Sequence, residues 1–442
     1  MAARVLARRR RRLVGAAVTV AAVALASACS SSGGSPNAGS SSSSSGTGSS
    51  GSASGGSSAS GSGSSSTPTA AGSGTVSEMD YYGTEPNKSA LGQLLDTCAS
   101  QAGVTIKRQV VEDLRTKLLQ LVGAHSLPDL VLVDNPDLDQ LAATGALVDL
   151  SSQGLSTDGF YPNVVAASTY QNKLYGLAAG VNALALYYNK KLFTAAGLQP
   201  PKTWSELKSD AAKLTNGQKQ FGLGMALPAT EEGSFQFESL LFSGGGDLKS
   251  LNSPQSVASL QLVSDMLNAG SMPKDILTWN QSNVEEQFAN GTLAMMVNGP
   301  WQLPVLAKAN VDFGIVTMPV PDAGGTPSSP LGGEVWAASQ GAHSAQAVAV
   351  IKCMTASTNA ATWSKLVNYV PANQAAAAQL PAQVPSMQTF VDEIAGAKGR
   401  TAELGPDYPK YSQALWTAVQ AVLSGHSSPQ AALDAAQKQA TG

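Results

Sequence analysis

The sequence predicts an α/β protein with two lobes, and three observations support this class. Short apolar strands alternate with amphipathic helices along the chain from residue 76. Some strands are apolar at every position, as in Leu130–Val133, which is typical of a mostly parallel sheet covered on both faces. The roughly 365 residues after residue 75 exceed what one core usually encloses, so two lobes are expected.

The expected elements fall into two runs. The first run comprises strands at Val76–Tyr82, Val104–Val111 and Leu130–Val133 and helices at Asn87–Ala102 and Asp113–Gly123. The second run begins at Lys190 and comprises helices near Trp204–Thr215 and Pro254–Asn268 and strands at Leu293–Val297 and Phe313–Met318. Ligands of open α/β sheets bind outside the carboxyl ends of the strands. The loops 83–87, 134–137, 181–183 and 298–301 are therefore the candidate site.

Residues 1–28 have the pattern of a secretory signal. Six arginines, at Arg4 and Arg8–Arg12, precede the short apolar run Leu13–Leu25. The segment Leu25–Cys29 resembles a bacterial lipobox, although Ala26 stands where Leu is favoured, and this resemblance implies that Cys29 is lipidated. The alternative is ordinary cleavage, with Cys29 as a bystander.

A Ser/Gly-rich segment follows, and residues 29–75 are expected to be a flexible tether that starts at the lipidated cysteine. Its root-mean-square reach would be about 35–40 Å. Of 27 basic residues, six lie in the signal, which leaves 21 against 30 acidic residues and a net charge of −9. An acidic chain without a basic stripe argues against nucleic acid as a partner. Any membrane attachment is expected to be by the lipid.

The remaining cysteines and the histidines indicate no metal site. Cys98 and Cys353 could form one disulfide in an oxidising compartment or remain two buried thiols, and the sequence leaves both open. The three histidines are isolated, without zinc-ligand spacing. No nucleotide-binding fingerprint, nucleophile elbow or acid pair stands in a suitable context. We therefore expect no cofactor and no catalytic residues.

The segment Phe288–Pro304, "FANGTLAMMVNGPWQLP", resembles a signature of the extracellular solute-binding proteins of ABC importers, the group that includes maltose-binding protein. Four further regions resemble that family in the same order: 127–151, 175–207, 311–339 and 414–439. The resemblance implies a type II periplasmic-binding-protein fold with a ligand cleft between lobes joined by hinge strands. It suggests one lobe at 76–182 and 319–384 and another at 183–318 and 385–442.

Two tryptophans are the main ligand-binding candidates. Aromatic faces stack on the C–H faces of sugar rings. The resemblance implies that Trp301 at the start of a helix and Trp416 in the terminal helix contact the ligand in this way. The alternative for both is core packing. Planar and polar side chains that would hydrogen bond sugar hydroxyls complete the set. The further candidates are Tyr82, Glu85, Asp134, Asn135, Asn182, Glu232, Phe235, Gln236 and Glu334.

The resulting hypothesis is a substrate-binding lipoprotein of an ABC importer. It would be anchored to the outer face of the cell membrane, act as a monomer, capture a carbohydrate such as an oligosaccharide, and deliver it to the permease subunits without catalysis. The alternatives are a binding protein for a non-sugar solute such as a polyamine or peptide, a secreted carbohydrate-active hydrolase, and a cell-surface adhesin.

Overall fold

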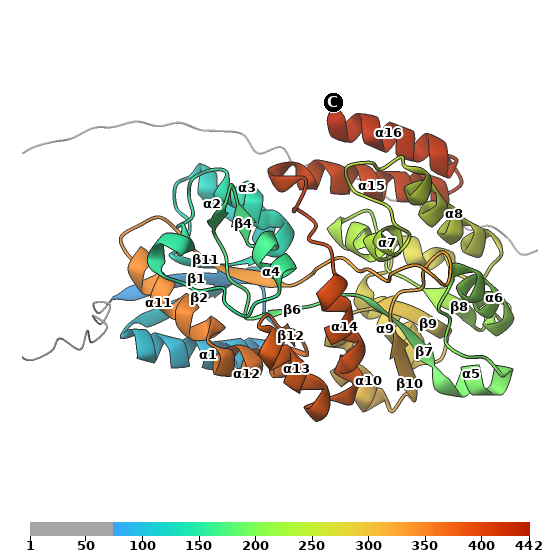
Figure 1. Cartoon of the computed structure of the whole chain (residues 1–442), viewed down its shortest axis with the longest axis horizontal. Helices are drawn as coiled ribbons and strands as arrows, with labels where there is room; N and C mark the ends of the chain where they lie inside the picture. Colours follow the sequence, from blue (N-terminus) through green and yellow to red (C-terminus); the bar gives the residue numbers. More distant parts are fainter. Residues whose placement is uncertain (1–73) are drawn as a thin grey trace, which may run out of the picture. The chain divides into compact units, whose positions relative to one another are not determined.

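The structure is a computed structural model that describes residues 74–442, all within one compact unit. The predicted signal, Cys29 and nearly all of the predicted tether lie outside the described residues. Within them, two four-stranded sheets form the centres of two lobes (Figure 1). This confirms the predicted α/β class with two lobes.

The first lobe is built on a sheet with the strand order β11-β3-β1-β2. Its strands are β1 (Thr75–Asp80), β2 (Thr105–Val110), β3 (Leu130–Asp134) and β11 (Glu334–Ala338). Strand β1 pairs in parallel with β2 and β3, whereas β11 pairs antiparallel with β3. Helices α1 (Asn87–Ala102), α11 (Ser344–Thr355) and α12 (Ser357–Val367) pack together beside this sheet.

The second lobe is built on a sheet with the order β10-β7-β9-β8. Its strands are β7 (Ala185–Asn189), β8 (Phe221–Gly224), β9 (Leu293–Asn298) and β10 (Phe313–Val316). Strand β8 is parallel to β9, and β7 is antiparallel to both β9 and β10. The expectation of mostly parallel pairing is therefore wrong for this sheet, although three of its four strands run in one direction.

The reversed strand of each sheet is the one that arrives from the other lobe. Glu334 begins β11 and lies opposite Asp134 at the end of β3. Ala185 begins β7 and lies opposite Asn298 at the end of β9. A chain that crosses between the lobes thus enters each sheet at the carboxyl ends of the other strands, and this makes the entering strand antiparallel. Both crossings place backbone at the edge where ligands of α/β proteins bind.

The remaining elements surround the two sheets. In the first lobe they are α2 (Leu114–Gly123), η1 (Asn135–Asp137), α3 (Leu138–Ala142), η2 (Leu150–Gln153), α4 (Pro162–Ala167), β4 (Thr169–Tyr170), β5 (Lys173–Leu174), β6 (Gly180–Val181) and β12 (Val370–Pro371). In the second lobe they are α5 (Lys190–Ala196), α6 (Trp204–Leu214), α7 (Glu231–Ser243), α8 (Pro254–Asn268), η3 (Lys274–Leu277), α9 (Gln281–Ala289), η4 (Pro300–Gln302) and α10 (Leu303–Ala309). The C-terminal elements are α13 (Gln374–Gln383), η5 (Pro385–Met387), α14 (Gln388–Gly396), η6 (Gly405–Asp407), α15 (Tyr408–Leu423) and α16 (Pro429–Thr441).

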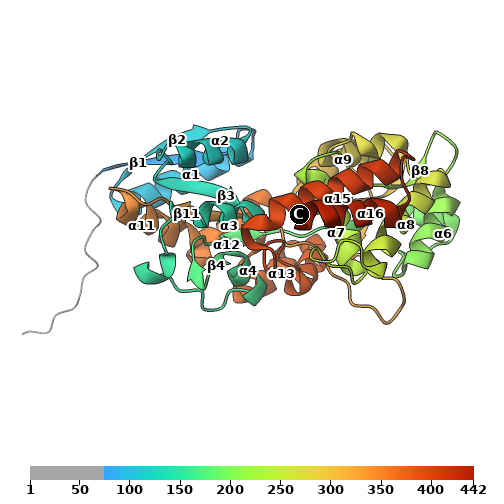
Figure 2. The same ribbon diagram turned by 90° about the horizontal axis from the view of Figure 1, so that it is seen from above.

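The C-terminal helices belong with the second lobe. Helices α15 and α16 pack on each other and on α8, as Figure 2 shows from above, and α14 contacts β7. The peptide N–H of Met318 donates to Glu393 of α14, and Val320 bridges to Thr203 at the start of α6. The lobe boundaries suggested by the sequence remain predictions.

Local sequence explains where the helices begin. Thr203 caps α6, and Glu206 bonds back to the backbone N–H of Thr203, which completes a capping box. Ser253 caps α8 with Pro254 in its first turn, where proline costs no hydrogen bond. The bounds of α1 and α8 agree with the sequence expectation, and β1, β2 and β10 are shorter than expected at one or both ends.

A disulfide joins Cys98 of α1 to Cys353 of α11 and decides the question left open by the sequence. The two cysteines are separated by 255 positions. The bond therefore links the N-terminal part of the first lobe to the part that returns after the second lobe. Among residues 74–442, no helix combines the length and apolarity that a membrane span requires.

Replacing both cysteines with serine is expected to lower the free energy of unfolding by about 2–4 kcal/mol, because the unfolded chain regains the freedom of a long loop. Urea denaturation followed by circular dichroism measures this. Wild-type protein unfolded under reducing conditions serves as the matched comparison and should behave like the double variant. Equal denaturation midpoints for the oxidised wild type and the variant would contradict the prediction.

Candidate functional site

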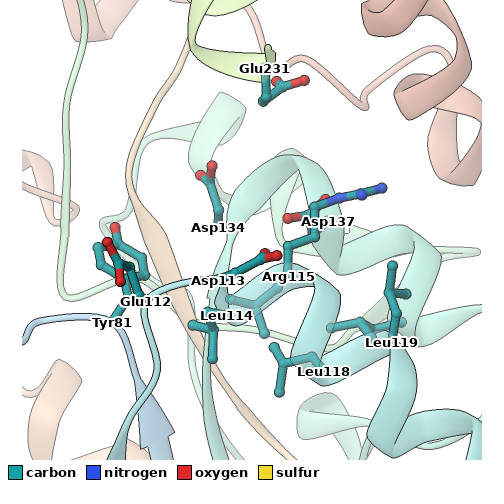
Figure 3. Close-up of a pocket in the computed structure, with 12 residues that line it drawn as sticks. Tyr81, Glu112, Asp113, Leu114, Arg115, Leu118, Leu119, Asp134, Asp137 and Glu231 are labelled. Carbon is teal, nitrogen blue, oxygen red and sulfur yellow. The ribbon is translucent and has the colours of Figure 1, made fainter. Parts of the chain in front are cut away.

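Two neighbouring cavities are lined by residues of both lobes. The first, of about 230 Å³, is lined by Tyr81, Glu112, Asp113, Leu114, Arg115, Leu118, Leu119, Val133, Asp134, Asp137, Leu141 and Glu231. The second, of about 210 Å³, is lined by Arg115, Asp137, Glu231, Tyr408, Pro409, Lys410, Gln413 and Trp416. Because three residues line both cavities, we treat them as one site, the interlobe cavity. Figure 3 shows Glu231 of α7 facing the first-lobe carboxylates Asp134 and Asp137.

Asp134 ends β3 and points into the interlobe cavity, as its place after an apolar strand predicted. The side chain keeps 39% of its surface open. Burial in the surrounding protein raises its pKa, and the nearby Arg400 guanidinium opposes that rise. A carboxylate oxygen held here can accept hydrogen bonds from a ligand.

Glu231 supplies the opposing carboxylate from the first turn of α7. Its Oε1 accepts a hydrogen bond from the Tyr408 hydroxyl at 2.5 Å, and its Oε2 accepts one from the Ser412 hydroxyl. Negative charge is favourable at the start of a helix, where backbone N–H groups lack partners. Burial nevertheless raises the pKa of Glu231, with the charge of Arg400 acting in the other direction.

Arg400 lies behind these two acids and is 4% exposed. Its Nη1 donates to Glu231 at 2.9 Å, and its Nη2 lies 3.2 Å from both Asp134 Oδ1 and Asn135 Oδ1. The guanidinium carbon also lies 4.8 Å from the ring centre of Phe235. One cation thus contacts acids of both lobes.

A second ion pair, Arg115 with Asp137, lines the interlobe cavity. Arg115 of α2 donates from Nε to Asp137 Oδ1 at 2.6 Å. Burial raises the pKa of Asp137 to about 7, helped by the charge of Asp134 and opposed by Arg115. Both partners belong to the first lobe, so this pair stays within one lobe.

Glu334 lies beneath the cavity edge in a group of tyrosines. It accepts hydrogen bonds from the hydroxyl of Tyr81 and, at 3.3 Å, from that of Tyr369. Burial raises the pKa of Glu334 to about 7. Tyr82 packs edge-on against Trp363 and its hydroxyl lies 3.5 Å from that of Tyr369. Tyr81, rather than the expected Tyr82, lines the cavity.

Trp301 lies where the two lobes meet. Its ring is partly buried, stacks on Phe235 of α7 and meets Tyr369 of the first lobe edge-on, both at 6.5 Å between ring centres. The ring folds back over Gly299, where an added Cβ would lie 2.1 Å from it. This explains the glycine of the Gly-Pro-Trp motif. Trp301 is not among the residues that line the interlobe cavity.

Asn298 lies one residue before Gly299, which is the N-terminal cap residue of the 3₁₀ element η4. The Asn298 side chain accepts from the N–H of Gly299 at 3.0 Å and donates to the carbonyl of Gln281 at 2.9 Å. It therefore joins η4 to the start of α9.

The remaining predicted ligand-binding residues differ in their surroundings, and only some of them reach the interlobe cavity. Trp416 lines the interlobe cavity, and Asn135 is buried with its amide on Arg400 and the carbonyl of Leu331. Asn182 is buried in the segment between β6 and β7, where its backbone pairs with that of Gly332. Gln236 is fully buried, and its side-chain amide has no hydrogen-bond partner in the described part of the chain.

Two predicted glutamates bond to helix starts. Glu85 is exposed and accepts from the hydroxyl and backbone N–H of Ser89. Glu232 accepts from the backbone N–H of Gln281 at 2.7 Å, at the start of α9. Ligand contact by either glutamate stays a prediction.

Sequence reasoning missed many residues of the site, including six whose contacts are described above. They are Tyr81, Arg115, Asp137, Glu231, Arg400 and Tyr408. Three of these six could have been found from the sequence, because Tyr81 and Glu231 adjoin predicted residues and Asp137 ends the predicted loop 134–137. Arg400 lies in an irregular segment without periodicity, and no pattern pointed to it.

The arrangement offers hydrogen-bond acceptors beside aromatic surfaces. Asp134, Asp137 and Glu231 supply carboxylate oxygens, and Tyr81 and Trp416 supply rings. Such a combination suits a ligand with many hydroxyl donors and apolar C–H faces.

Comparison with known proteins gives the family. Residues 93–431 match the family model described as bacterial extracellular solute-binding protein. The chain belongs to this family. The resemblance inferred from the sequence is thereby confirmed.

Three similar proteins illustrate the family's range. The chain is 27% identical to the galactooligosaccharide-binding protein of Bacillus subtilis, over 75% of this chain and 80% of that protein. The solved structure of the cyclic α-maltosyl-1,6-maltose binding protein from Arthrobacter globiformis superposes with a TM-score of 0.71 at 25% identity, over 83% of this chain and 97% of that one. A putative binding protein of Brucella abortus is 26% identical over 51% of this chain, and the match spans 58% of its length.

Glu334→Gln is expected to remove a pH dependence of stability. Between pH 4.5 and about 7 the folded state retains a proton on Glu334 that the unfolded state releases, so the free energy of unfolding falls as the pH rises. The contribution is on the order of 3 kcal/mol across this window. Urea denaturation of both proteins at intervals from pH 4.5 to 8 measures the difference.

The exposed glutamate variant Glu85→Gln serves as the control and should follow the wild type. If the wild type and Glu334→Gln show parallel pH profiles, the group titrates at the same pH in the folded and unfolded chain.

Proposed function

We propose that this protein captures a carbohydrate in the interlobe cavity and delivers it to the membrane subunits of an ABC importer. The observation that carries the proposal is the cavity itself, in which carboxylates and rings from two lobes converge on one space. Membership of the extracellular solute-binding family and the oligosaccharide names of two similar proteins support the choice of ligand class.

The proposed contacts divide by chemistry. Trp416, and Trp301 once the lobes part, would stack on sugar rings. Asp134 and Glu231 would accept hydrogen bonds from hydroxyls, one from each lobe. Because a ligand that touches both lobes favours their closure, binding would stabilise a closed state that the importer recognises. The protein would release its ligand chemically unchanged.

The proposed setting follows from the N-terminal sequence. Cleavage before Cys29 and its lipidation would anchor the mature chain to the outer face of the membrane, with the residues from 30 to the start of β1 at Thr75 as a tether. A long tether would let the binding domain reach the importer. We propose that the protein acts as a monomer.

A panel of mono- and oligosaccharides is expected to contain at least one ligand that raises the melting temperature. At a ligand concentration of 100 times Kd, binding adds about 2.7 kcal/mol to the free energy of unfolding. Differential scanning fluorimetry identifies the ligand, and chromatography of the recovered sugar tests whether it is intact. A panel of polyamines and short peptides run in parallel distinguishes the non-sugar alternative. A hydrolysed sugar would instead favour an enzyme.

Trp301→Ala and Trp416→Ala are each expected to weaken binding of that sugar at least tenfold, the equivalent of about 1.4 kcal/mol, because the stacking surface is lost. Trp204→Phe is the control, since the Trp204 indole donates to the Pro319 carbonyl and does not line the cavity. Isothermal titration calorimetry measures Kd. Unchanged affinity in a folded Trp301→Ala protein would leave that ring a structural role only.

A further inference from the structure

Arg400 has an unusual position for a buried cation, because its hydrogen bonds run to both lobes. On the first lobe it contacts Asp134 and Asn135, and on the second lobe it contacts Glu231. The two carboxylates belong to the rims of the interlobe cavity that face each other. A single side chain of the protein therefore makes the kind of two-sided contact that a ligand makes when it closes such a cavity.

The backbone that carries Arg400 is fixed at the connection between the lobes. The backbone of Lys398 pairs with the segment that leads into β11, donating to the Ser329 carbonyl and accepting from the Leu331 N–H. Arg400 Nε donates to the Leu331 carbonyl at 3.3 Å. Asn163 of the first lobe donates to the Ala397 carbonyl. Because this segment is held at the connection between the lobes, separation of the lobes must break the contact of the guanidinium with at least one of them.

The surroundings favour a guanidinium in particular. Its flat face lies against the ring of Phe235, and Tyr408 lies 5.9 Å away. Its separate N–H groups donate to two acids, Asp134 and Glu231, and to the Leu331 carbonyl, which an ammonium cannot do from one point. Without it, Asp134 would face Glu231 and the fully buried Glu238 with no intervening positive charge.

We propose that Arg400 is a latch that holds the lobes together before any ligand arrives and thereby positions the two halves of the binding site. The ligand part of this inference rests on the proposed function. A protein already held near its closed arrangement spends less binding energy on closure, so its apparent affinity is higher. Arg400 thus contributes to affinity as a positioning residue, through the arrangement of Asp134 and Glu231.

A competing explanation is that Arg400 only neutralises charge within the folded chain. It predicts that removing the guanidinium lowers stability but leaves the separation of the lobes unchanged. The latch predicts a change in that separation without ligand. The measurement must therefore report on geometry rather than stability.

The test measures the distance between the lobes in the ligand-free full chain. Spin labels on genetically encoded keto amino acids at the exposed positions Asp96 of α1 and Lys213 of α6 leave all three cysteines unmodified. Double electron–electron resonance gives the distance distribution. The latch predicts that Arg400→Met shifts the distribution away from that of the wild type and broadens it, and that Arg400→Lys lies between the two.

Arg115→Met is the matched control for the distance measurement. It also removes a guanidinium from the cavity wall, but its partners Asp137 and Gln140 lie in its own lobe. It should leave the ligand-free distribution unchanged. Asp134→Asn removes the charge of the first-lobe partner while keeping Arg400, and it should shift the distribution in the same direction as Arg400→Met. This variant keeps the test decisive if Arg400→Met does not fold.

Overlapping distributions for the wild type and the folded Arg400 and Asp134 variants would overturn the latch. A shift that Arg115→Met shares would also overturn it. With a sugar from the panel, Arg400→Met should raise Kd at least tenfold, and an unchanged Kd would overturn the positioning role. If no sugar binds the wild type, the proposed function fails, but the ligand-free distances still decide whether the latch exists.

Discussion

The direction of the strands is the constraint on which the cavity depends. In both sheets the parallel strands end at the side where the lobes meet, so β3 delivers Asp134 there and β9 delivers Asn298. The chain must cross this same region to pass from one sheet to the other. The crossing strands consequently begin at the cavity edge, and this brings Glu334 to it from a segment 200 residues after Asp134 in sequence. Topology alone therefore gathers distant polar residues in one place.

Carboxylates gathered at an interface repel one another and lose solvation. Two arrangements in this protein reduce that unfavourable energy. Asp134 and Glu231 share the positive charge of Arg400. Glu334 has no cation among its described hydrogen-bond partners and is surrounded by tyrosine hydroxyls that donate to it. A buried ion without a partner is strongly unfavourable, whereas a paired or protonated one is tolerable.

The regular part of the fold could be predicted from the sequence, because periodicity and capping are local signals. Helix α8 occupies the expected residues, with Ser253 and Pro254 marking its start. The site was only partly predictable. Asp134 could be predicted because it ends an apolar strand. Arg400 could not, because it interacts with a residue 266 positions away and lies in an irregular segment without a sequence pattern. Whether Tyr81 or Tyr82 lines the cavity depends on how the chain turns after β1 ends at Asp80. Side chains alternate between the two faces of a strand, but this alternation is not fixed beyond the strand end.

The Gly-Pro-Trp motif shows how local and distant constraints combine. Gly299 leaves room for the ring of Trp301 to fold back over the backbone, and this position sets the ring against Phe235 and Tyr369. Phe235 moves with Trp301 because both belong to the second lobe, whereas Tyr369 belongs to the first. Separation of the lobes would consequently uncover one edge of the indole at the same time as it breaks the contacts of Arg400. An aromatic surface and unpaired carboxylates would then become available together, so recognition and closure depend on the same interface.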